Sequence, residues 1–277
     1  MRILVTGAGG QLGRAVVAAL GDRDVVAADR AALDVGDRDA VVGAITSLRP
    51  DVIVHAAAWT DVDGCESNPD RAYRDNAMSV RHVSDGARRV GAHVVTLSTD
   101  YVFDGETDRP YVEWDTPNPL SVYGRSKRAG ELEVDPSCAV VRTTWVFSAA
   151  VGLVQAIVRL GRGEGQLRFV QDNYACPTYV GDLALAVRDL ALARLPGIFH
   201  VTNQGATTPF DLARETLRLA GEDPDRAVAV TSAELARPAR RPARSDLDNA
   251  ALRLSGLPLL PDHREPLERL VKELVTS

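Results

Sequence analysis

The chain has 277 residues, 45% of them hydrophobic and 25% charged, which is typical of a globular protein and excludes a largely disordered one. Its formal net charge of −6 argues against nucleic acid as the main partner, because proteins that bind phosphate backbones usually carry a basic excess. The three widely spaced cysteines, Cys65, Cys138 and Cys176, form neither a disulfide framework nor a zinc-binding pattern, and a reducing compartment fits best.

The first residues, Met1 to Gly7, lead directly into the pattern of a buried strand and leave no room for a secretion signal. No apolar run approaches the roughly 20 residues that a helix needs to span a bilayer. We therefore expect a cytoplasmic protein with no membrane partner.

In the first half of the chain, short apolar runs alternate with stretches whose apolar residues have helical spacing. Strands are predicted at residues 3–5, 25–28, 52–55, 94–97 and 139–142, and helices at 13–20, 38–48, 71–90 and 122–132. This alternation predicts an α/β fold of the Rossmann type, in which a doubly wound parallel sheet is covered by helices on both faces.

The second half is less regular. Helices are predicted at residues 151–160, 180–193 and 209–219, and a short strand at 197–201. We expect a dinucleotide-binding domain over residues 1–145, with returning segments from the second half, and a small, mainly substrate-binding α/β domain over 146–277. Residues 236–244, here called the arginine loop, are basic and interrupted by prolines, which makes a continuous helix there unfavourable.

A glycine-rich turn follows the first predicted strand and opens the first predicted helix. The run Gly7-Ala8-Gly9-Gly10-Gln11-Leu12-Gly13 allows a tight turn, close approach of a pyrophosphate and close packing of helix on strand. Such a run can be a purely structural turn, but its position between strand and helix favours a dinucleotide cofactor.

The second and third predicted strands end in residues suited to the same cofactor. Asp29 can accept hydrogen bonds from the adenine ribose, which favours NADH, whereas the next residue, Arg30, can hold a 2′-phosphate, which favours NADPH. The sequence leaves open which of the two cofactors is used, and the alternative is that Asp29 and Arg30 form a solvated turn without a cofactor contact. The small side chains of Ala56, Ala57 and Ala58 would let the dinucleotide lie close to the sheet.

Tyr123 and Lys127 are four residues apart, so on a helix their side chains share one face. A nearby ammonium would stabilise the phenolate and bring the tyrosine pKa closer to neutral, as acid–base catalysis requires. Thr99, at the end of the fourth strand, can hydrogen-bond a substrate oxygen. Alone, the pair would be an ordinary surface pair, but here it follows the glycine turn in the expected order.

Taken together, these motifs resemble the extended short-chain dehydrogenase/reductase superfamily over almost the whole chain. Within it, the chain most resembles the dTDP-4-dehydrorhamnose reductase family, through the segments His55-Ala-Ala-Ala-Trp-Thr-Asp-Val-Asp63, Ser98-Thr-Asp-Tyr-Val-Phe103, Tyr123-Gly-Arg-Ser-Lys127, Arg142-Thr-Thr-Trp-Val146, Cys176-Pro-Thr178 and Arg240-Arg-Pro-Ala-Arg-Ser245. The resemblance implies reduction of a 4-keto-6-deoxyhexose carried on dTDP, with NADPH and possible use of NADH.

The resemblance also implies roles for individual residues. It makes Thr99, Tyr123 and Lys127 catalytic, and brings Asn76 to a position that orders an active-site water. It assigns the cofactor to Gly10, Gln11, Leu12, Asp29, Asp34, Val35, Ala56, Ala57 and Ala58, and the sugar to Thr99, Asp100 and Trp145. The reasoning from the residues themselves adds Gly7, Arg30, Tyr123 and Lys127 to the expected cofactor contacts.

The chain departs from the family pattern in two places. Residues 146–154 lack the family's glycine-rich stretch followed by Asn-Phe. The identity of the sugar therefore stays open, and another dTDP-deoxysugar ketoreductase is the alternative function. Arg14-Ala15-Val16 offers no carboxylate where some members bind a bridging cation, so we expect no metal.

Two other functions share the fold. Dehydratases of the superfamily carry Glu after the fourth-strand Thr-Asp, where this chain has Tyr101, which argues against dehydration. A non-catalytic NADP-binding regulatory subunit would not need an intact Thr99, Tyr123 and Lys127.

In the arginine loop, Arg240 or Arg241 is expected to clamp the substrate diphosphate, although a solvated loop is the alternative. The expected partner is a nucleotide sugar, bound by a monomer or weak homodimer.

Overall fold

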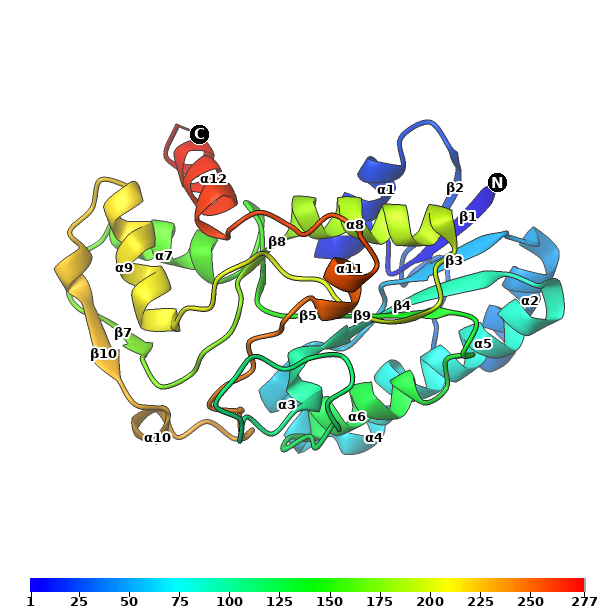
Figure 1. The fold of residues 1–277 in the computed structure, drawn as a ribbon, viewed down its shortest axis with the longest axis horizontal. Coiled ribbons are helices and arrows are strands. Elements are labelled where there is room, and N and C mark those ends of the chain that lie inside the picture. Colours follow the sequence, from blue (N-terminus) through cyan, green and yellow to red (C-terminus); the bar gives the residue numbers. More distant parts are fainter. Residues whose placement is uncertain (277) are drawn as a thin grey trace.

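The computed structural model describes residues 1–276. Its larger lobe is built on a six-stranded, fully parallel sheet with the order β2-β1-β3-β4-β5-β9. The strands are β1 (Arg2–Thr6), β2 (Asp24–Ala28), β3 (Val52–His55), β4 (His93–Thr99), β5 (Ala139–Thr143) and β9 (Gly197–His200). The doubly wound sheet predicted from the alternating pattern is therefore confirmed (Figure 1).

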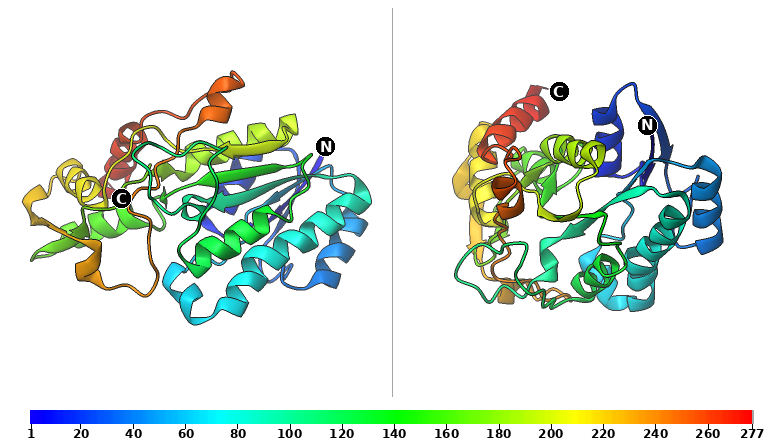
Figure 2. Two further views of the ribbon diagram at one scale, coloured as in Figure 1. Left: turned by 60° about the horizontal axis from the view of Figure 1, so that its bottom comes forward. Right: turned by 45° about the vertical axis from the view of Figure 1, so that its right-hand side comes forward.

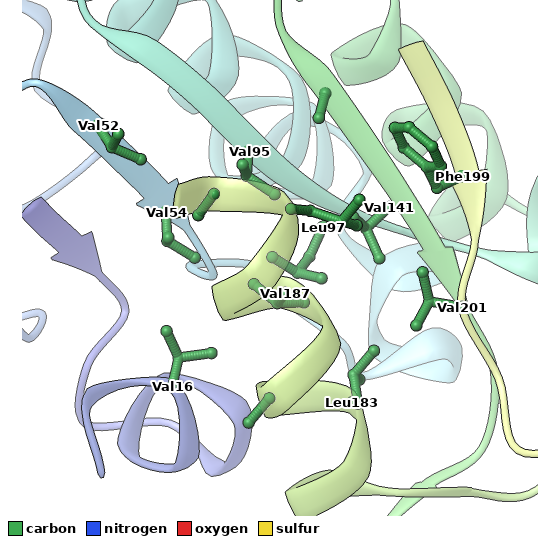
Figure 3. Close-up of a cluster of buried hydrophobic side chains, with 14 of the residues drawn as sticks. Val16, Val52, Val54, Val95, Leu97, Val141, Leu183, Val187, Phe199 and Val201 are labelled. Carbon is green, nitrogen blue, oxygen red and sulfur yellow. The ribbon is translucent and has the colours of Figure 1, made fainter. Parts of the chain in front are cut away.

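Helices cover both faces of this sheet because its inner strands are buried throughout and must be shielded on each side. One face carries α1 (Gln11–Leu20) and α8 (Val180–Ala193), whose Val16, Leu183 and Val187 pack on the valines of the sheet (Figure 3). The other face carries α2 (Arg38–Leu48), α5 (Ser79–Val90) and α6 (Val122–Glu131) (Figure 1). Strand β9 and helix α8 come from the second half of the chain.

The helix predicted over residues 71–90 is interrupted. Helices α3 (Val62–Ser67) and α4 (Pro69–Tyr73) are followed by a single π-helical turn, Arg74–Met78, which leads directly into α5. Such turns insert one residue into a helix and often occur at functional sites. Asn76 is buried in this turn.

The smaller lobe, at the left of Figure 1, is formed by the second half of the chain. Helices α7 (Leu153–Gly161), α9 (Pro209–Leu219) and α12 (Arg264–Thr276) share one apolar cluster. A two-stranded parallel ribbon of β7 (Leu167–Val170) and β10 (Ala227–Val230) lies beside α9, and Figure 2 shows this lobe from two further sides. The remaining elements are short: β6 (Val146–Phe147), β8 (Thr178–Tyr179), α10 (Ser232–Leu235), α11 (Ala250–Leu254) and 3-10 turns at Asp100–Val102 and Pro224–Arg226.

The sequence analysis did not predict β7, β10 or α12. Both strands have only four residues, too few for a clear period, whereas the apolar residues 267, 270, 271 and 274 of α12 do have helical spacing and could have indicated it. The arginine loop contains no helix, as its prolines predicted. Within residues 1–276, no helix has the length and apolar character needed to cross a membrane.

A buried ion pair joins α6 to the sheet. The guanidinium of Arg142 in β5 donates to both carboxylate oxygens of Glu131 at 2.8 Å, and both side chains are 1% exposed. The hydroxyl of Ser98 in β4 and the guanidinium of Arg128 donate to the same carboxylate at 2.6 and 2.9 Å. Burial favours the neutral acid, but these donors hold the pKa of Glu131 below its usual range. The carboxylate thus fixes α6 against β4 and β5.

Replacing Glu131 with alanine should lower the free energy of unfolding by about 3–5 kcal/mol, because it leaves an unpaired guanidinium in the core. Urea denaturation followed by circular dichroism measures the loss. Glu133→Ala is the matched control, since Glu133 pairs with Arg81 at the surface and should contribute little. Equal losses for the two variants would contradict the structural importance of the buried pair.

Candidate active site

The order in which successive strands are added to the sheet reverses at β1. Strand β2 lies on one side of β1 and β3 on the other, and the carboxyl ends of two such strands form the crevice in which open α/β sheets bind ligands. Gly7 follows β1 with a φ of 70°, and a Cβ there would lie 2.6 Å from the backbone nitrogen of Ala57, which follows β3. Only glycine fits, so the crevice stays open.

The start of α1 faces this crevice. Its N-cap residue, Gly10, makes no side-chain capping bond, so the first backbone N–H groups of the helix remain available to an anion. A Cβ at Gly13 would lie 2.1 Å from the Gly7 carbonyl oxygen, which explains why this turn is glycine-rich. These features fit a dinucleotide pyrophosphate.

A cavity of about 400 Å³ continues from the glycine turn along the ends of β2 and β3. Its lining includes most of the residues predicted to bind the cofactor, namely Gly7, Gly10, Asp29, Arg30, Asp34, Val35, Ala56, Ala57 and Ala58. Gln11 and Leu12 lie in the first turn of α1, where Gln11 donates to the Val146 carbonyl at 3.4 Å and Leu12 packs on the core.

Two charged groups in this cavity differ in how they are engaged. The Asp29 carboxylate accepts the backbone N–H groups of Ala31 and Ala32 at 3.0 and 2.9 Å, which fixes its position. Arg30 is exposed, and its guanidinium has no hydrogen bond or salt bridge with any other residue of 1–276. A free cation beside a fixed carboxylate fits a cofactor with a ribose 2′-phosphate.

Asp34 is already paired. Its carboxylate accepts from the guanidinium of Arg74 at 2.6 Å, and the Gly36 amide together with Arg74 lowers the pKa of Asp34. Asp34 therefore lines the cavity as an ionised carboxylate whose charge is balanced by Arg74.

The three predicted catalytic residues are buried together where β4 meets α6. Thr99, Tyr123 and Lys127 are 5%, 9% and 5% exposed. The α6 helix begins at a Ser121 cap, which accepts the Gly124 amide at 3.1 Å and fixes the first turn carrying Tyr123. The Lys127 ammonium donates to the Leu97 carbonyl at 2.7 Å, and burial lowers the pKa of Lys127 to about 8.

The electrostatics of Tyr123 differ from the sequence-based expectation. Burial raises the pKa of the Tyr123 phenol above its usual range, and a hydrogen bond with Thr99 lowers it only in part. The phenol is therefore protonated at neutral pH. The sequence could indicate a lysine one turn away, but it could not indicate how deeply the ring is buried.

A second, larger cavity of about 630 Å³ lies between the two lobes. Its residues come from strand ends of the larger lobe, from the smaller lobe and from the arginine loop; they include Tyr101, Trp145, Phe147, Arg168, Phe169, Arg237, Arg240, Arg241 and Ser245. Trp145 has a left-handed backbone with a φ of 40°. Thr99 and Asp100 are not among the residues of 1–276 that line this cavity; they lie behind Tyr101.

The two arginines predicted to clamp a diphosphate are engaged differently. The Arg241 guanidinium donates to both carboxylate oxygens of Asp63 at 2.9 and 3.1 Å, and Asp63 also accepts the Ala239 amide. Arg240 is exposed at the cavity, and its guanidinium makes no salt bridge with the rest of the described chain. Arg240 is thus the one free to meet an anion.

The sequence analysis did not single out Asp63, Tyr101, Arg168 or Arg237 as site residues. Asp63 and Tyr101 lie in segments that carried the family resemblance, so their position in a motif could have indicated them. The Tyr101 ring packs edge-on against Tyr123, with centroids 5.8 Å apart. Arg168 lies outside any motif, and only the fold brings it to the cavity, whereas Arg237 belongs to the arginine loop.

The buried amide of Asn76 holds backbone and helix together. It accepts the Trp59 amide at 2.8 Å, and its nitrogen donates to the Trp59 carbonyl at 3.1 Å and to the Ser126 hydroxyl at 3.0 Å. The side chain thus links the end of β3 to α6. Its role as the residue that orders a water stays a prediction.

Within residues 1–276, no cluster of three or more His, Cys, Asp or Glu side chains could hold a metal ion. The site combines a cofactor cradle at the glycine turn with a tyrosine and a lysine that are buried in α6. That combination defines a dinucleotide-dependent enzyme of the extended short-chain dehydrogenase/reductase type.

Comparison with known proteins narrows this class. A family model described as the RmlD substrate binding domain matches residues 1–276. A protein of Streptomyces griseus named dTDP-4-dehydrorhamnose reductase is 44% identical over 268 residues, 92% of this chain and 88% of its own length. The chain belongs to the dTDP-4-dehydrorhamnose reductase family.

Solved structures agree over the whole fold. The dTDP-4-dehydrorhamnose reductase of Clostridium acetobutylicum is 36% identical, with a TM-score of 0.96 over 99% of both chains. The enzyme of that name from Bacillus anthracis, in complex with NADP, is 34% identical, with a TM-score of 0.94 over 98% of this chain and 99% of its own.

Proposed function

We propose that this protein reduces the 4-keto group of dTDP-4-dehydro-L-rhamnose to give dTDP-L-rhamnose, with NADPH as the reductant. Relatives of that name match the chain over nearly its full length, and one of them was solved with NADP. The observation that carries the proposal is the buried, protonated phenol of Tyr123, whose ring packs against Tyr101, a residue that lines the larger cavity.

The cofactor would lie in the smaller cavity, with its pyrophosphate at the glycine turn and its adenine ribose between Asp29 and Arg30. When bound, NADPH supplies the hydride that reduces the keto carbon. Tyr123 provides the proton for the oxygen, and Thr99 hydrogen-bonds that oxygen. Lys127 holds the nicotinamide ribose and stabilises the tyrosine after it has given its proton.

The substrate would occupy the larger cavity. Trp145 offers an apolar surface to the deoxysugar, and Arg240 offers its free guanidinium to the diphosphate. Arg241, held by Asp63, would support the loop from behind. In this division of labour, residues 1–145 mainly bind the cofactor and residues 146–277 mainly bind the substrate.

We also propose that the protein works in the cytoplasm as a monomer or weak homodimer. The supporting observation for the compartment is that Cys65, Cys138 and Cys176 are free, buried thiols.

Tyr123→Phe should reduce kcat by about 100-fold or more, because it removes the only proton that the ring can give. NADPH affinity should stay nearly unchanged. Oxidation of NADPH with dTDP-4-dehydro-L-rhamnose measures the rate, and Tyr73→Phe, at an exposed tyrosine, is the control. Near-normal turnover of Tyr123→Phe would show that another group donates the proton.

Arg30→Ala should weaken NADPH by roughly ten- to a hundredfold, which corresponds to a charged hydrogen bond of about 1.5–3 kcal/mol. NADH, which lacks the 2′-phosphate, should bind as before. Fluorescence titration of both cofactors measures the effect, with the exposed Arg89→Ala as control. Equal weakening of both cofactors would mean that Arg30 does not recognise the phosphate.

Arg240→Ala should raise KM for the sugar nucleotide about ten- to a hundredfold without changing NADPH affinity, since it removes a free cation from the larger cavity. Arg89→Ala again serves as control. An unchanged KM would indicate that Arg240 is solvated during turnover and that the diphosphate is bound elsewhere.

A further inference from the structure

Asp100 is a carboxylic acid buried directly behind the catalytic threonine. It is 2% exposed, and the hydroxyls of Ser245, Thr99 and Thr144 all interact with its carboxyl group. The Thr99 hydroxyl lies 3.0 Å from one oxygen, and the Ser245 hydroxyl lies 2.6 Å from the other. Ser245 directly follows the arginine loop and lines the larger cavity, so Asp100 connects that cavity to Thr99.

The state of Asp100 decides where the single hydroxyl hydrogen of Thr99 points. An ionised carboxylate can only accept, so Thr99 would have to donate to it. Thr99 also accepts the Tyr101 amide at 3.2 Å, and therefore no hydrogen would remain for a substrate oxygen. A neutral acid can instead donate to Thr99, which frees the threonine hydrogen.

We propose, on the basis of the function proposed above, that Asp100 is a positioning residue that works in its neutral form. It donates to Thr99 and so directs the threonine hydroxyl to the keto oxygen, while Ser245 donates to its other oxygen. The three groups then form one chain of donors that ends at the substrate. Hydrogen bonds in such a chain polarise and strengthen one another.

Burial shifts Asp100 towards the neutral acid, which in the absence of substrate is still the minor form at pH 7. It raises the pKa of this carboxyl to about 6, although the hydroxyls of Ser245 and Thr99 lower it in part. A buried acid that stays neutral and donates a hydrogen bond is an established way to stabilise a developing oxyanion. Substrate in the larger cavity would exclude more water and add negative charge, and both effects raise the pKa further.

The titratable groups around Asp100 do not offset this effect. Tyr101, Tyr123 and Cys176 all interact electrostatically with it and are neutral at neutral pH, since burial raises the pKa of each.

Most cations on neighbouring elements are engaged elsewhere, whereas Arg237 and Arg240 of the arginine loop line the larger cavity and make no salt bridge within residues 1–276. Lys127 of α6 bonds the Leu97 carbonyl. On the side of the arginine loop, Arg241 is paired with Asp63, and Arg244 with Asp246 at 2.8 Å.

The decisive variant is Asp100→Asn, because an amide has the shape of the neutral acid. Its nitrogen can donate to Thr99 and its oxygen can accept from Ser245. In the unsubstituted enzyme, kcat should fall about tenfold per pH unit above the pKa of Asp100. In Asp100→Asn this decline should be absent, so that its kcat at pH 7.5 equals or exceeds that of the unsubstituted enzyme. A decline near pH 8 caused by Lys127 should occur in both.

Two further variants test whether the decline in kcat comes from the ionisation of Asp100. Ser245→Ala removes a donor that stabilises the ionised form, so the decline in kcat should move to higher pH. Glu113→Gln is the matched control, since Glu113 is also a buried acid with a raised pKa, but it bonds the His200 and Ala251 amides away from both cavities. Its pH profile should equal that of the unsubstituted enzyme.

A measurement without substrate makes the test independent of turnover. In protein labelled at the aspartate carboxyl carbon, the NMR signal lost in Asp100→Asn identifies Asp100. Its titration midpoint should lie well above the ordinary aspartate value and rise further in Ser245→Ala. A midpoint at or below the ordinary value would overturn the proposal.

The kinetic test has equally clear outcomes. If folded Asp100→Asn binds NADPH normally but has at least tenfold lower kcat at every pH, the ionised carboxylate is the active form and the proposal is wrong. A decline in Asp100→Asn identical to that of the unsubstituted enzyme would also overturn it. Failure of the unsubstituted enzyme to reduce any 4-keto sugar nucleotide would instead refute the proposed function, and the NMR result would still decide the state of Asp100.

Discussion

The guanidinium of Arg142 and the carboxylate of Glu131 form a buried ion pair, and segments of the candidate active site are attached to it. Glu131 lies one helical turn beyond Lys127 and two beyond Tyr123, so the same carboxylate that fixes α6 sets the depth of both side chains. Ser98, which donates to that carboxylate, immediately precedes Thr99. Arg142 lies three residues before Trp145. Three separate segments of the site therefore share one anchor.

The two cavities place different demands on the chain. The smaller one combines backbone and small side chains at the ends of β1 and β3 with charged side chains that follow β2. The larger one is formed by aromatic rings and guanidinium groups from several distant segments. Tyr123 and Thr99 are buried where β4 meets α6, and burial raises the pKa of the Tyr123 phenol above its usual range.

Much of this organisation could be predicted because it depends on local pattern. The apolar runs that form β1, β3, β4 and β5 are buried on both faces, and the glycine turn follows from the steric limit at Gly7. The position of Tyr123 and Lys127 on one helix follows from their spacing. Each of these features is decided within a few residues of chain.

The other features of the site depend on contacts between residues that are far apart in the sequence. Asp63 and Arg241 are 178 residues apart, so their ion pair, which separates the role of Arg241 from that of Arg240, is visible only in the folded chain. The same holds for the pKa values, because burial, not the neighbouring lysine, dominates at Tyr123. The likeness of motifs predicts the residues of the site, but the fold determines their protonation states.

The left-handed backbone at Trp145 has a consequence for how far this protein can be stabilised. A bulky residue with a positive φ costs on the order of 1–3 kcal/mol relative to glycine, which adopts that conformation freely. Folding alone would favour a glycine there, yet glycine would leave the larger cavity without one of its aromatic walls. Thermostability selection without a functional screen would therefore tend to discard this indole, producing a sturdier chain with a cavity less able to hold its ligand.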